Sequence, residues 1–429
     1  MYKKRNGEIM KTILQYSWIL CMVLSASSGC SSETVPPAPE PLPVEQGQFG
    51  GEGVSQGNNR FAMELYGMAC QADQTSNIFF SPLSISSALA MTYAGARGQT
   101  AEEMNDVLHF GTEPGDIGEE FAVLLGSMSS GTLQGADSGE PFTLSIANGL
   151  WVADGFALLP SYVQEMQSRF DAAVENLDFI GAPEASRETI NGWIADKTLD
   201  RITNLIPSGM LDQETRVVLT NAVYFKASWD KPFEEAVTSD GRFMLADGSA
   251  TVVPMMTQTE FFDYVSTEGC SAVELPYAGG GASMLILLPD GDIESFQQDL
   301  DTGKLTTIRS RMSRVNILLT MPRFEFTRSM QLGQILREMG MEMPFQGSAD
   351  FSGITGQPNL YISEVMHKAF VKVDEEGTEA AAATAVIMNI TAMPPPPVEM
   401  TVNRPFIFLI IDEQTGSIVF MGRVMDPSV

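Results

Sequence analysis

Residues 375–386 read EEGTEAAAATAV, a stretch with almost no side chain large enough to pack against a core. Alanine favours helix, but a helix made mostly of alanine has no apolar stripe wide enough to hold it on a core. The four prolines of MPPPPVEM (393–400) then exclude a helix or a central strand and favour an extended, exposed run. The sequence therefore predicts an exposed loop of about 25 residues, and loops of that length are usually functional or disordered.

The segments on both sides of this loop carry the patterns of regular secondary structure. Apolar residues at helical spacing predict helices in RFAMELYGMAC (60–70), LSISSALAMTYAGA (83–96) and SMQLGQILREMGM (329–341). Helices early in the chain and strands throughout predict one α+β domain with several sheets at 58–429. The strands, predicted from β-branched and aromatic residues, are FTLSIANGLWVA (142–153), RVVLTNAVYFKASW (216–229), ASMLILLP (282–289), VNILLTMPRFEF (315–326), PFIFLIID (405–412) and SIVFMGRV (417–424).

The composition limits the classes of partner. The chain has 429 residues, 44% of them hydrophobic, and a formal net charge of −29. This length and apolar content suffice for a large core. The acidic balance argues against nucleic acid, heparin or another polyanion as a partner, because bulk charge would repel each of them.

The first residues have the features of an export signal. Basic residues border the apolar run ILQYSWILCMVLSA (13–26), which suits a signal peptide and is short for a membrane span. Met10 is an alternative start. Gly29–Cys30 resembles the bacterial lipoprotein processing site, where the cysteine receives the lipid, although Ser27 stands where leucine is usual.

The sequence thus predicts a signal peptide at 1–29 and lipidation of Cys30. Residues 30–57 are rich in Pro, Gly, Ser, Glu and Gln, which predicts a tether from the membrane to the domain. The protein is expected to be exported and anchored at the outer surface or in the periplasm, and the alternative is ordinary secretion. Cys70 and Cys270 could form a disulfide or remain two buried thiols, and the sequence does not decide between them.

Catalytic patterns are weak. With only two histidines, no HExxH motif and no Cys/His cluster of metal spacing, the sequence predicts no metal and no cofactor. A GxSxG pattern occurs as GVSQG (53–57), but it lies in the tether rather than between a strand and a helix. Ser228 and Lys231 form an SxxK pattern without the SDN and KTG elements of penicillin-recognising hydrolases, which leaves a surface hydrolase as a remote alternative.

The chain resembles the serpins, a family of serine protease inhibitors, over essentially all of 58–429. The resemblance implies a monomeric fold of three β-sheets and eight or nine helices, with a reactive-centre loop at about 377–402, and no enzymatic activity. It rests on six blocks in the family's order, namely NIFFSPLSISSALAMTYAGARGQTAEEM (77–104), LTNAVYFKASWDKPF (219–233), LTMPRFEF (319–326), ADFSGIT (349–355), SEVMHKAFVKVDEEGTEAAAATA (363–385) and NRPFIFLIIDEQTGSIVFMGRV (403–424).

In inhibitory serpins a protease cleaves the loop, and insertion of the loop into the central sheet traps the acyl-enzyme. Residues 378–391 contain no proline, and alternate residues from Thr378 to Met388 are small or apolar, as a buried strand face requires. Glu379 falls on the opposite face. These features predict a working inhibitor rather than a non-inhibitory serpin, which would be cleaved without trapping the enzyme. The predicted hinge is Glu375, Gly377, Thr378, Glu379, Ala380, Ala381, Ala382 and Ala383.

The family's usual loop length, counted from Gly377, predicts cleavage at Thr391–Ala392, with Ala392–Met393 as second choice. Either bond offers a small, uncharged residue to the primary pocket of the protease. This predicts elastase-like or subtilisin-like serine proteases as targets rather than trypsin-like ones, whose pocket carboxylate prefers Lys or Arg. A cysteine protease is a further candidate.

The resemblance also assigns residues outside the loop. Ser81, Ser84, Asn221 and His367 match a polar cluster beneath the sheet, where strands part during insertion. The alternative is that they are ordinary buried polar groups that satisfy one another. Trp229 matches the aromatic residue where the loop enters the sheet, with plain core packing as its alternative, and Glu375 matches the acid that anchors the hinge.

Overall fold

A six-stranded sheet forms the centre of the computed structural model, which describes residues 53–129, 143–267, 269–378 and 396–429. β11 and β4 of this sheet pair in parallel, and β12 lies beside both. The order across the sheet is β10 (Phe324–Gln331), β11 (Ile362–Val373), β12 (Gly377–Thr378), β4 (Val217–Ser228), β2 (Thr143–Ala153) and β3 (Ala173–Leu177).

The remaining described strands form one nine-stranded ladder with two sections. β6 (Ala250–Thr267) belongs to both: β9 pairs along one of its edges, while β5 pairs with the start and β7 with the end of its other edge. Together with the central sheet, these sections account for the three sheets expected. The path is β1 (Ile78–Phe80), β15 (Ile418–Val424), β14 (Phe406–Asp412), β8 (Ala282–Pro289), β7 (Cys270–Pro276), β6, β9 (Ser313–Pro322) and β13 (Val398–Thr401), with β5 (Ser239–Met244) beside β6.

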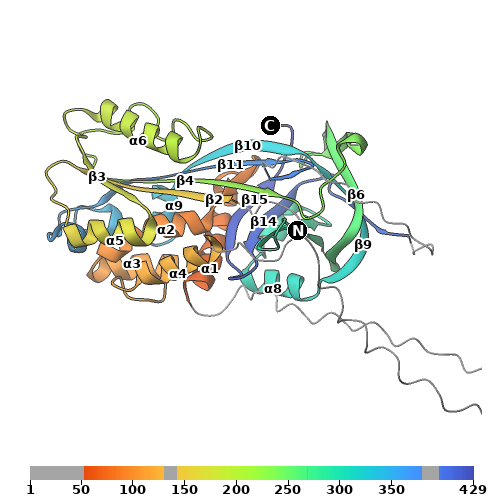
Figure 1. Cartoon of the computed structure of the whole chain (residues 1–429), viewed down its shortest axis with the longest axis horizontal. Helices are drawn as coiled ribbons and strands as arrows, with labels where there is room; N and C mark the ends of the chain where they lie inside the picture. The colour runs from red at the N-terminus through yellow and green to blue at the C-terminus, as the bar shows by residue number, and fades with distance from the viewer. Residues whose placement is uncertain (1–52, 130–142, 268, 379–395) are drawn as a thin grey trace, which may run out of the picture. The chain divides into compact units, whose positions relative to one another are not determined.

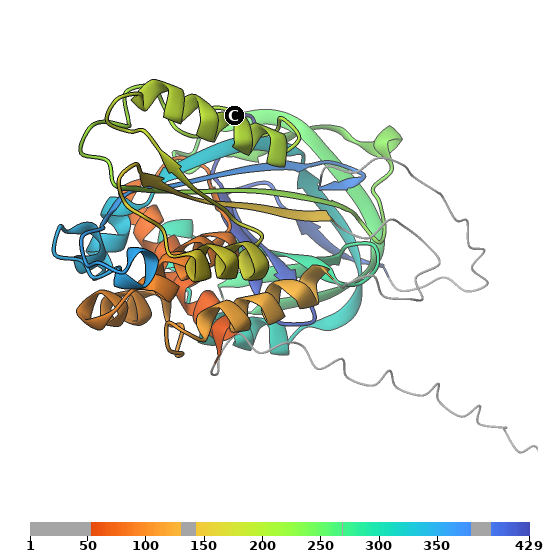
Figure 2. The same cartoon turned by 60° about the vertical axis from the view of Figure 1, so that its left-hand side comes forward.

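Helices cover both faces of the central sheet, as Figures 1 and 2 show. α6 (Pro183–Lys197) lies on one face, while α1 (Val54–Ala72), α2 (Pro82–Gly95), α3 (Gly98–Leu108), α4 (Ile117–Ser129) and α5 (Pro160–Phe170) gather on the other. The described residues hold four further α-helices, which are α7 (Ile293–Gln298), α8 (Thr302–Ser310), α9 (Gly333–Glu338) and α10 (Ser352–Thr355), and short 3-10 turns at Glu235–Val237 and Met343–Phe345. The α+β fold expected from the sequence is therefore confirmed.

β4 is buried on both faces, and its sequence explains why. Leu219 and Val223 point into the main core, whereas Val218 and Ala222 belong to the smaller core beneath α6. A strand covered on both faces needs a nearly continuous apolar run, which VVLTNAV supplies. The polar residues within that run therefore need partners inside the protein.

α2 passes through the core and is buried along its whole length. It begins at Pro82, where a missing N–H costs nothing, and the Ser81 hydroxyl accepts a hydrogen bond from the Ser84 N–H at 3.2 Å. Small residues such as Ser86, Ser87 and Ala88 let the helix pack closely against its neighbours. This geometry fixes Ser81 and Ser84 beneath the central sheet.

The domain begins earlier than the predicted Asn58, because α1 begins at Val54. Val54 is buried, and the Ser55 hydroxyl donates to the Thr415 carbonyl at 3.0 Å, so these residues belong to the domain and not to the tether. Asn59 donates in the same way to the Gly416 carbonyl at 2.9 Å. The Ser55 of the GxSxG pattern thus ties the first helix to the last hairpin.

The helix predicted at 329–341 is wrong in its first part. Ser329, Met330 and Gln331 continue β10 and pair with β11, and α9 occupies only Gly333–Glu338. Pairing with a long neighbouring strand outweighed the helical spacing of the apolar residues, since local propensity is a weak prior. The strands predicted at 405–412 and 417–424 are confirmed, and β14 and β15 pair as an antiparallel hairpin.

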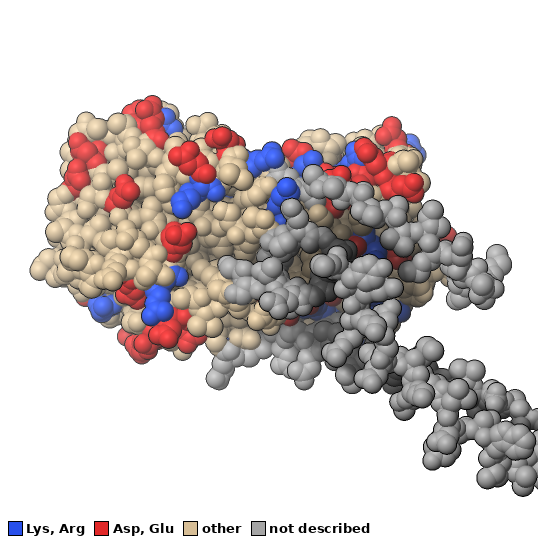
Figure 3. All heavy atoms as spheres, viewed as in Figure 1, with Lys and Arg blue, Asp and Glu red and all other residues tan. Residues whose placement is uncertain are grey.

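Two features of the structure concern binding to polyanions and to membranes: the distribution of surface charge, and the length and apolar character of the helices. Acidic and basic side chains are interspersed over the face seen in Figure 3, and Lys and Arg do not collect there into one stripe. Within the described ranges, no helix has both the length and the apolar character needed to cross a membrane.

A buried ionic cluster joins α8 to β7 and to the residue that follows β14. Arg309 of α8, 3% exposed, donates to the Glu274 carboxylate through Nε at 3.1 Å, and its Nη2 also contacts Glu413 at 2.6 Å. The Ser283 hydroxyl lies 2.5 Å from both carboxylates. Burial, and then the nearby Glu274, raises the pKa of Glu413 above its ordinary value.

We expect Arg309→Met to destabilise the domain by about 3–5 kcal/mol, because it leaves the buried Glu274 without its counter-charge. The measurement is the midpoint of urea unfolding followed by circular dichroism. Arg311→Met, at an exposed position just after the same helix, is the matched control and should change little. Equal midpoints for the two variants would contradict this account of the cluster.

Candidate functional site

The central sheet is closed at one end and parted at the other. β4 and β11 pair directly only as far as Val223 and Ala369 in the described ladder. Further along, Thr378 of β12 lies between them, opposite Ala227 on one side and Val373 on the other. β12 is antiparallel to both neighbours. The first two residues of the expected loop, Gly377 and Thr378, therefore already occupy the sheet.

Backbone hydrogen bonds hold the residues just before β12. The Trp229 N–H donates to the Glu376 carbonyl at 2.9 Å, and the Trp229 indole N–H donates to the Asp374 carbonyl at 3.0 Å. The Phe233 N–H donates to the Glu375 carbonyl at 2.8 Å. Residues 374–376 thus form a turn clamped onto the end of β4, and Trp229 supplies two of its three clamping donors.

Tyr277 contacts both Trp229 and β12. Its ring stacks on Trp229 with centroids 4.7 Å apart, and its hydroxyl lies 2.7 Å from the Thr378 hydroxyl. Burial raises the pKa of Tyr277 well above its ordinary value, so the hydroxyl stays neutral and can share a proton with Thr378. Trp229 therefore lies where the loop enters the sheet, with the hinge residues rather than with the polar cluster.

Glu375 is held by an arginine and a threonine. Arg323 Nε donates to Glu375 Oε1 at 2.7 Å, and the Thr238 hydroxyl donates to the same oxygen. Burial raises the pKa of this carboxyl, but the hydrogen bonds from Arg323 and Thr238 outweigh it and bring the pKa below its ordinary value. Glu375 is thus an ionised anchor that fastens the start of the loop to β9 and β10 through Arg323, which joins them.

Gly377 sits where no other residue fits. Its φ is +153°, and a Cβ built on it would lie 2.1 Å from the Ala227 carbonyl oxygen and 2.7 Å from the Ser228 Cα. Both atoms belong to the backbone of β4 and cannot move aside like a side-chain end. The close approach of β12 to β4 therefore depends on a glycine at this position.

The four residues of the predicted polar cluster are in contact. His367 Nε2 accepts from the Ser81 N–H at 3.1 Å, so Nδ1 carries the ring proton and donates to Asn221 Oδ1 at 2.6 Å. Asn221 Nδ2 in turn reaches the Ser84 hydroxyl at 2.5 Å and its carbonyl at 3.0 Å. Burial lowers the pKa of His367 to about 3, which keeps the ring neutral.

This cluster spans the sheet and has a member that the sequence did not reveal. His367 of β11 and Asn221 of β4 are direct register partners, and Asn221 also lies opposite Asn148 of β2. Asn148 accepts from Asn221 Nδ2 at 2.7 Å and donates to the Ser87 hydroxyl at 2.8 Å. The available signal was a polar residue within the apolar strand predicted at 142–153.

Several predicted site residues lie outside the described residues. The same is true of the signal peptide and of nearly all of the tether. The site residues concerned are Cys30, the hinge residues Glu379, Ala380, Ala381, Ala382 and Ala383, and the residues of the two candidate scissile bonds, Thr391, Ala392 and Met393.

The described residues offer little other chemistry. Cys70 and Cys270 are both free and buried, so they form no disulfide with each other. Burial raises the pKa of Cys270 to about 12 and also raises that of Cys70, so neither thiol is an activated nucleophile. In the described part of the chain, no group of three or more His, Cys, Asp or Glu side chains could hold a metal ion.

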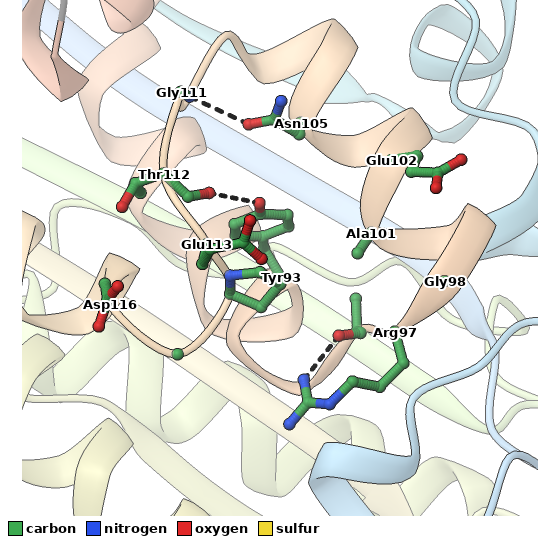
Figure 4. Close-up of a pocket in the computed structure, with 13 residues that line it drawn as sticks. Tyr93, Arg97, Gly98, Ala101, Glu102, Asn105, Gly111, Thr112, Glu113 and Asp116 are labelled. Atoms are coloured by element: carbon green, nitrogen blue, oxygen red, sulfur yellow. Dashed lines mark hydrogen bonds between the residues drawn. The ribbon is translucent and has the colours of Figure 1, made fainter.

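A surface hollow of about 830 Å³ lies between α3 and the loop that follows it (Figure 4). Polar side chains of the hollow form hydrogen bonds with the backbone of this loop. The Tyr93 hydroxyl donates to the Thr112 carbonyl at 2.6 Å, and Asn105 Oδ1 accepts from the Gly111 N–H at 3.0 Å. Burial, and then the Glu113 carboxylate, raises the pKa of Tyr93 to about 12. These contacts hold a turn in place, so the parted sheet remains the candidate site.

Comparisons with known proteins agree with this geometry. A family model described as "Serpin (serine protease inhibitor)" matches residues 56–427. An uncharacterised serpin-like protein of Thermococcus kodakarensis is 41% identical over 372 residues, which is 86% of this chain and 84% of that protein. The leukocyte elastase inhibitor of Bos taurus is 38% identical over 386 residues, covering 88% of this chain and 100% of the inhibitor.

Solved structures of the same family superpose on the described fold. The structure of uncleaved ovalbumin has a TM-score of 0.79 at 28% identity and covers 87% of this chain and 100% of its own. A serpin of the insect Tenebrio molitor has a TM-score of 0.76 at 29% identity and covers 87% of this chain and 98% of its own.

We expect Gly377→Ala to drive β12 out from between β4 and β11, because the added methyl group would overlap the Ala227 carbonyl. The measurement is hydrogen exchange: amides of residues 373–378 should exchange faster than in the wild-type protein. Gly115→Ala is the control, since a Cβ there meets nothing within 4 Å. Unchanged protection of 373–378 in Gly377→Ala would show that the close approach is absent in solution.

We expect His367 to make the domain less stable as the pH falls below 6.5. The folded pKa is about 3, so the unfolded chain binds a proton between these values and the folded chain does not. The slope is about 1.4 kcal/mol per pH unit. Thermal midpoints measured from pH 7 to pH 5 should fall less in His367→Gln than in the wild type or in His109→Gln, the control at the other histidine. Parallel profiles for all three proteins would rule this out.

Proposed function

The chain belongs to the serpin family, and on that premise we propose that it inhibits serine proteases as a suicide substrate. The observation that carries this proposal is the parted sheet, in which Gly377 and Thr378 lie between β4 and β11. A strand that begins between two neighbours can extend along the same gap. The absence of proline from residues 378–391 supports such an extension.

The proposed reaction begins with the protease. Its catalytic serine attacks the carbonyl carbon of Thr391, the peptide bond to Ala392 breaks, and the new amine of Ala392 leaves with a proton. The carbonyl of Thr391 is then an ester of the protease serine. Residues 379–391, released at one end, continue β12 down the sheet and carry the acylated protease with them before water hydrolyses the ester.

The described pairing gives this insertion a driving force. β4 and β11 pair directly in parallel over Val217–Val223 and Ile362–Ala369, and parallel pairing is the less stable kind. A strand continuing from Thr378 would replace this one parallel ladder with two antiparallel ladders. The backbone thereby gains hydrogen bonds, each with a net value of about 0.5–1.5 kcal/mol.

We propose elastase-like or subtilisin-like enzymes as targets. The small, uncharged residues at Thr391–Ala392 support this, and so does the 38% identity to a leukocyte elastase inhibitor. The bond Ala392–Met393 is the second choice, and a cysteine protease is a further candidate. The acidic composition supports the proposal that neither heparin nor nucleic acid assists.

We also propose that the inhibitor works at a membrane surface as a monomer. The signal-like segment at 1–29 and Cys30 support export and lipid attachment, and the Pro- and Gly-rich stretch after Cys30 supports a tether. Mass spectrometry of the protein purified from membranes tests this: a diacylglyceryl adduct on Cys30 is expected, and an unmodified chain in the medium would refute it.

The inhibitory function is tested by mixing the chain from residue 53 onward with pancreatic-type elastase and, separately, with subtilisin. Denaturing gels should show an adduct of inhibitor and protease, and intact-mass analysis should find a fragment that begins at Ala392. Complete cleavage with active protease remaining would instead indicate a non-inhibitory serpin. The absence of any cleavage would refute the proposed specificity.

We expect Ala382→Arg to convert the inhibitor into a substrate, because residue 382 lies on the strand face that would be buried on insertion. The number of inhibitor molecules consumed per protease trapped should rise at least tenfold. Ala381→Arg, one residue earlier and on the opposite face, should show a much smaller rise. Equal losses in the two variants would contradict a loop inserted as a regular strand.

A further inference from the structure

One aromatic side chain in the described part of the chain is exposed, and it lies near the departure of the loop. Phe261 of β6 is 55% exposed, while every other described Phe, Tyr or Trp is buried or half-buried. Its neighbour Phe262 is 2% exposed, as the alternation of a strand requires. Phe261 is therefore exposed to solvent on the β6–β9–β13 section, whose strands β6 and β9 lie at the right-hand side of Figure 1.

The register places Phe261 level with the end of the loop. Phe261 lies opposite Asn316 of β9, and the next residue of β9, Ile317, lies opposite Val398 of β13. The row through Phe261 thus runs to Pro397, the residue just before β13. Two strand spacings of 4.7–4.9 Å separate the two ends of this row, or about 10 Å.

The groups around Phe261 have the character of an interface rim. Leu318 and Asn316 beside it are half-buried, and Thr259 and Glu399 on the same face are exposed. Asp263 of β6 and Arg314 of β9 are register partners two residues further along these strands. Aromatic residues are enriched at the centres of protein interfaces, and the rim around such a centre is polar.

We propose that Phe261 and the face around it form an accessory contact for the protease bound at the reactive-centre loop. The inference rests on the proposed function and deepens it. Pro397 is the fifth residue after Ala392, and this length of chain spans at most about 18 Å when fully extended. A protease domain of about 240 residues has a radius of gyration of about 18 Å, so its body would reach this face when its active site holds Thr391–Ala392.

The contact acts before the covalent step. A protease held by both the loop and Phe261 dissociates more slowly from the first complex, so a larger share proceeds to the acyl-enzyme. Insertion of the loop occurs elsewhere, between β4 and β11, and does not involve β6. Loss of Phe261 should therefore change the rate of inhibition but not the number of inhibitor molecules consumed per trapped protease.

The test compares Phe261→Ala, Phe261→Tyr and the wild-type protein in inhibition kinetics against elastase and subtilisin. Val252→Ala is the matched control, because Val252 lies on the same strand and is 62% exposed but is distant from the loop. For the protease that is trapped, we expect the association rate constant of Phe261→Ala to fall about five- to tenfold. Phe261→Tyr should restore it, with the stoichiometry of inhibition and the thermal midpoint unchanged throughout.

Rates for Phe261→Ala within twofold of the wild type, with a normal covalent adduct, would overturn the accessory contact and leave the inhibitory function intact. A wild-type protein that forms no adduct at all would overturn both. A wild-type dimer in sedimentation that Phe261→Ala abolishes, with an unchanged rate constant, would assign the face to a second copy of the chain and also overturn the proposal.

Discussion

An unfinished hydrogen-bond ladder between β4 and β11 is the constraint on which the rest of the structure depends. The two strands pair directly up to Val223 and Ala369 but continue to Ser228 and Val373. Buried backbone groups require partners, so strands that diverge inside a covered sheet need something between them. β12 supplies this at the far end, and Gly377 is the residue that lets it come close enough.

The closed part of the ladder is secured by side chains as well as by backbone. The His367–Asn221 hydrogen bond joins the two strands that a lengthening β12 would have to separate, and Asn221 is tied in turn to Ser84 and Asn148. Leaving a buried donor or acceptor unpaired costs about 1–3 kcal/mol. The cluster therefore resists gradual opening, and an incoming strand must replace its hydrogen bonds as it displaces them.

The sequence predicts the fold better than it predicts the site. Strands such as 216–229 were readable because burial on both faces demands an apolar run, and the α+β class follows from such segments. Arg323, Thr238 and Tyr277 could not be found this way, because each acts on the loop from a strand or loop distant in sequence. The segment 329–331 was misread because its pairing with β11 depends on a partner about 40 residues away.

The contacts that hold the residues before β12 and those that join β4 to β11 lie at two ends of the gap along which the loop would insert. An inhibitor that acts as proposed must not insert its loop before cleavage, although two antiparallel ladders would be more stable than the present parallel one. The residues just before β12 are held by the Glu375–Arg323 pair and by the Trp229 donors. The His367–Asn221 hydrogen bond joins β11 to β4 in the part of the sheet where these strands pair directly. On the proposed mechanism both sets must break before the loop inserts, and the lifetime of the native state would then depend on the height of that barrier rather than on the free energy of the native state. In the proposed reaction, cleavage of the loop removes the covalent restraint at its far end, so that only the hydrogen bonds of these two sets would still oppose insertion.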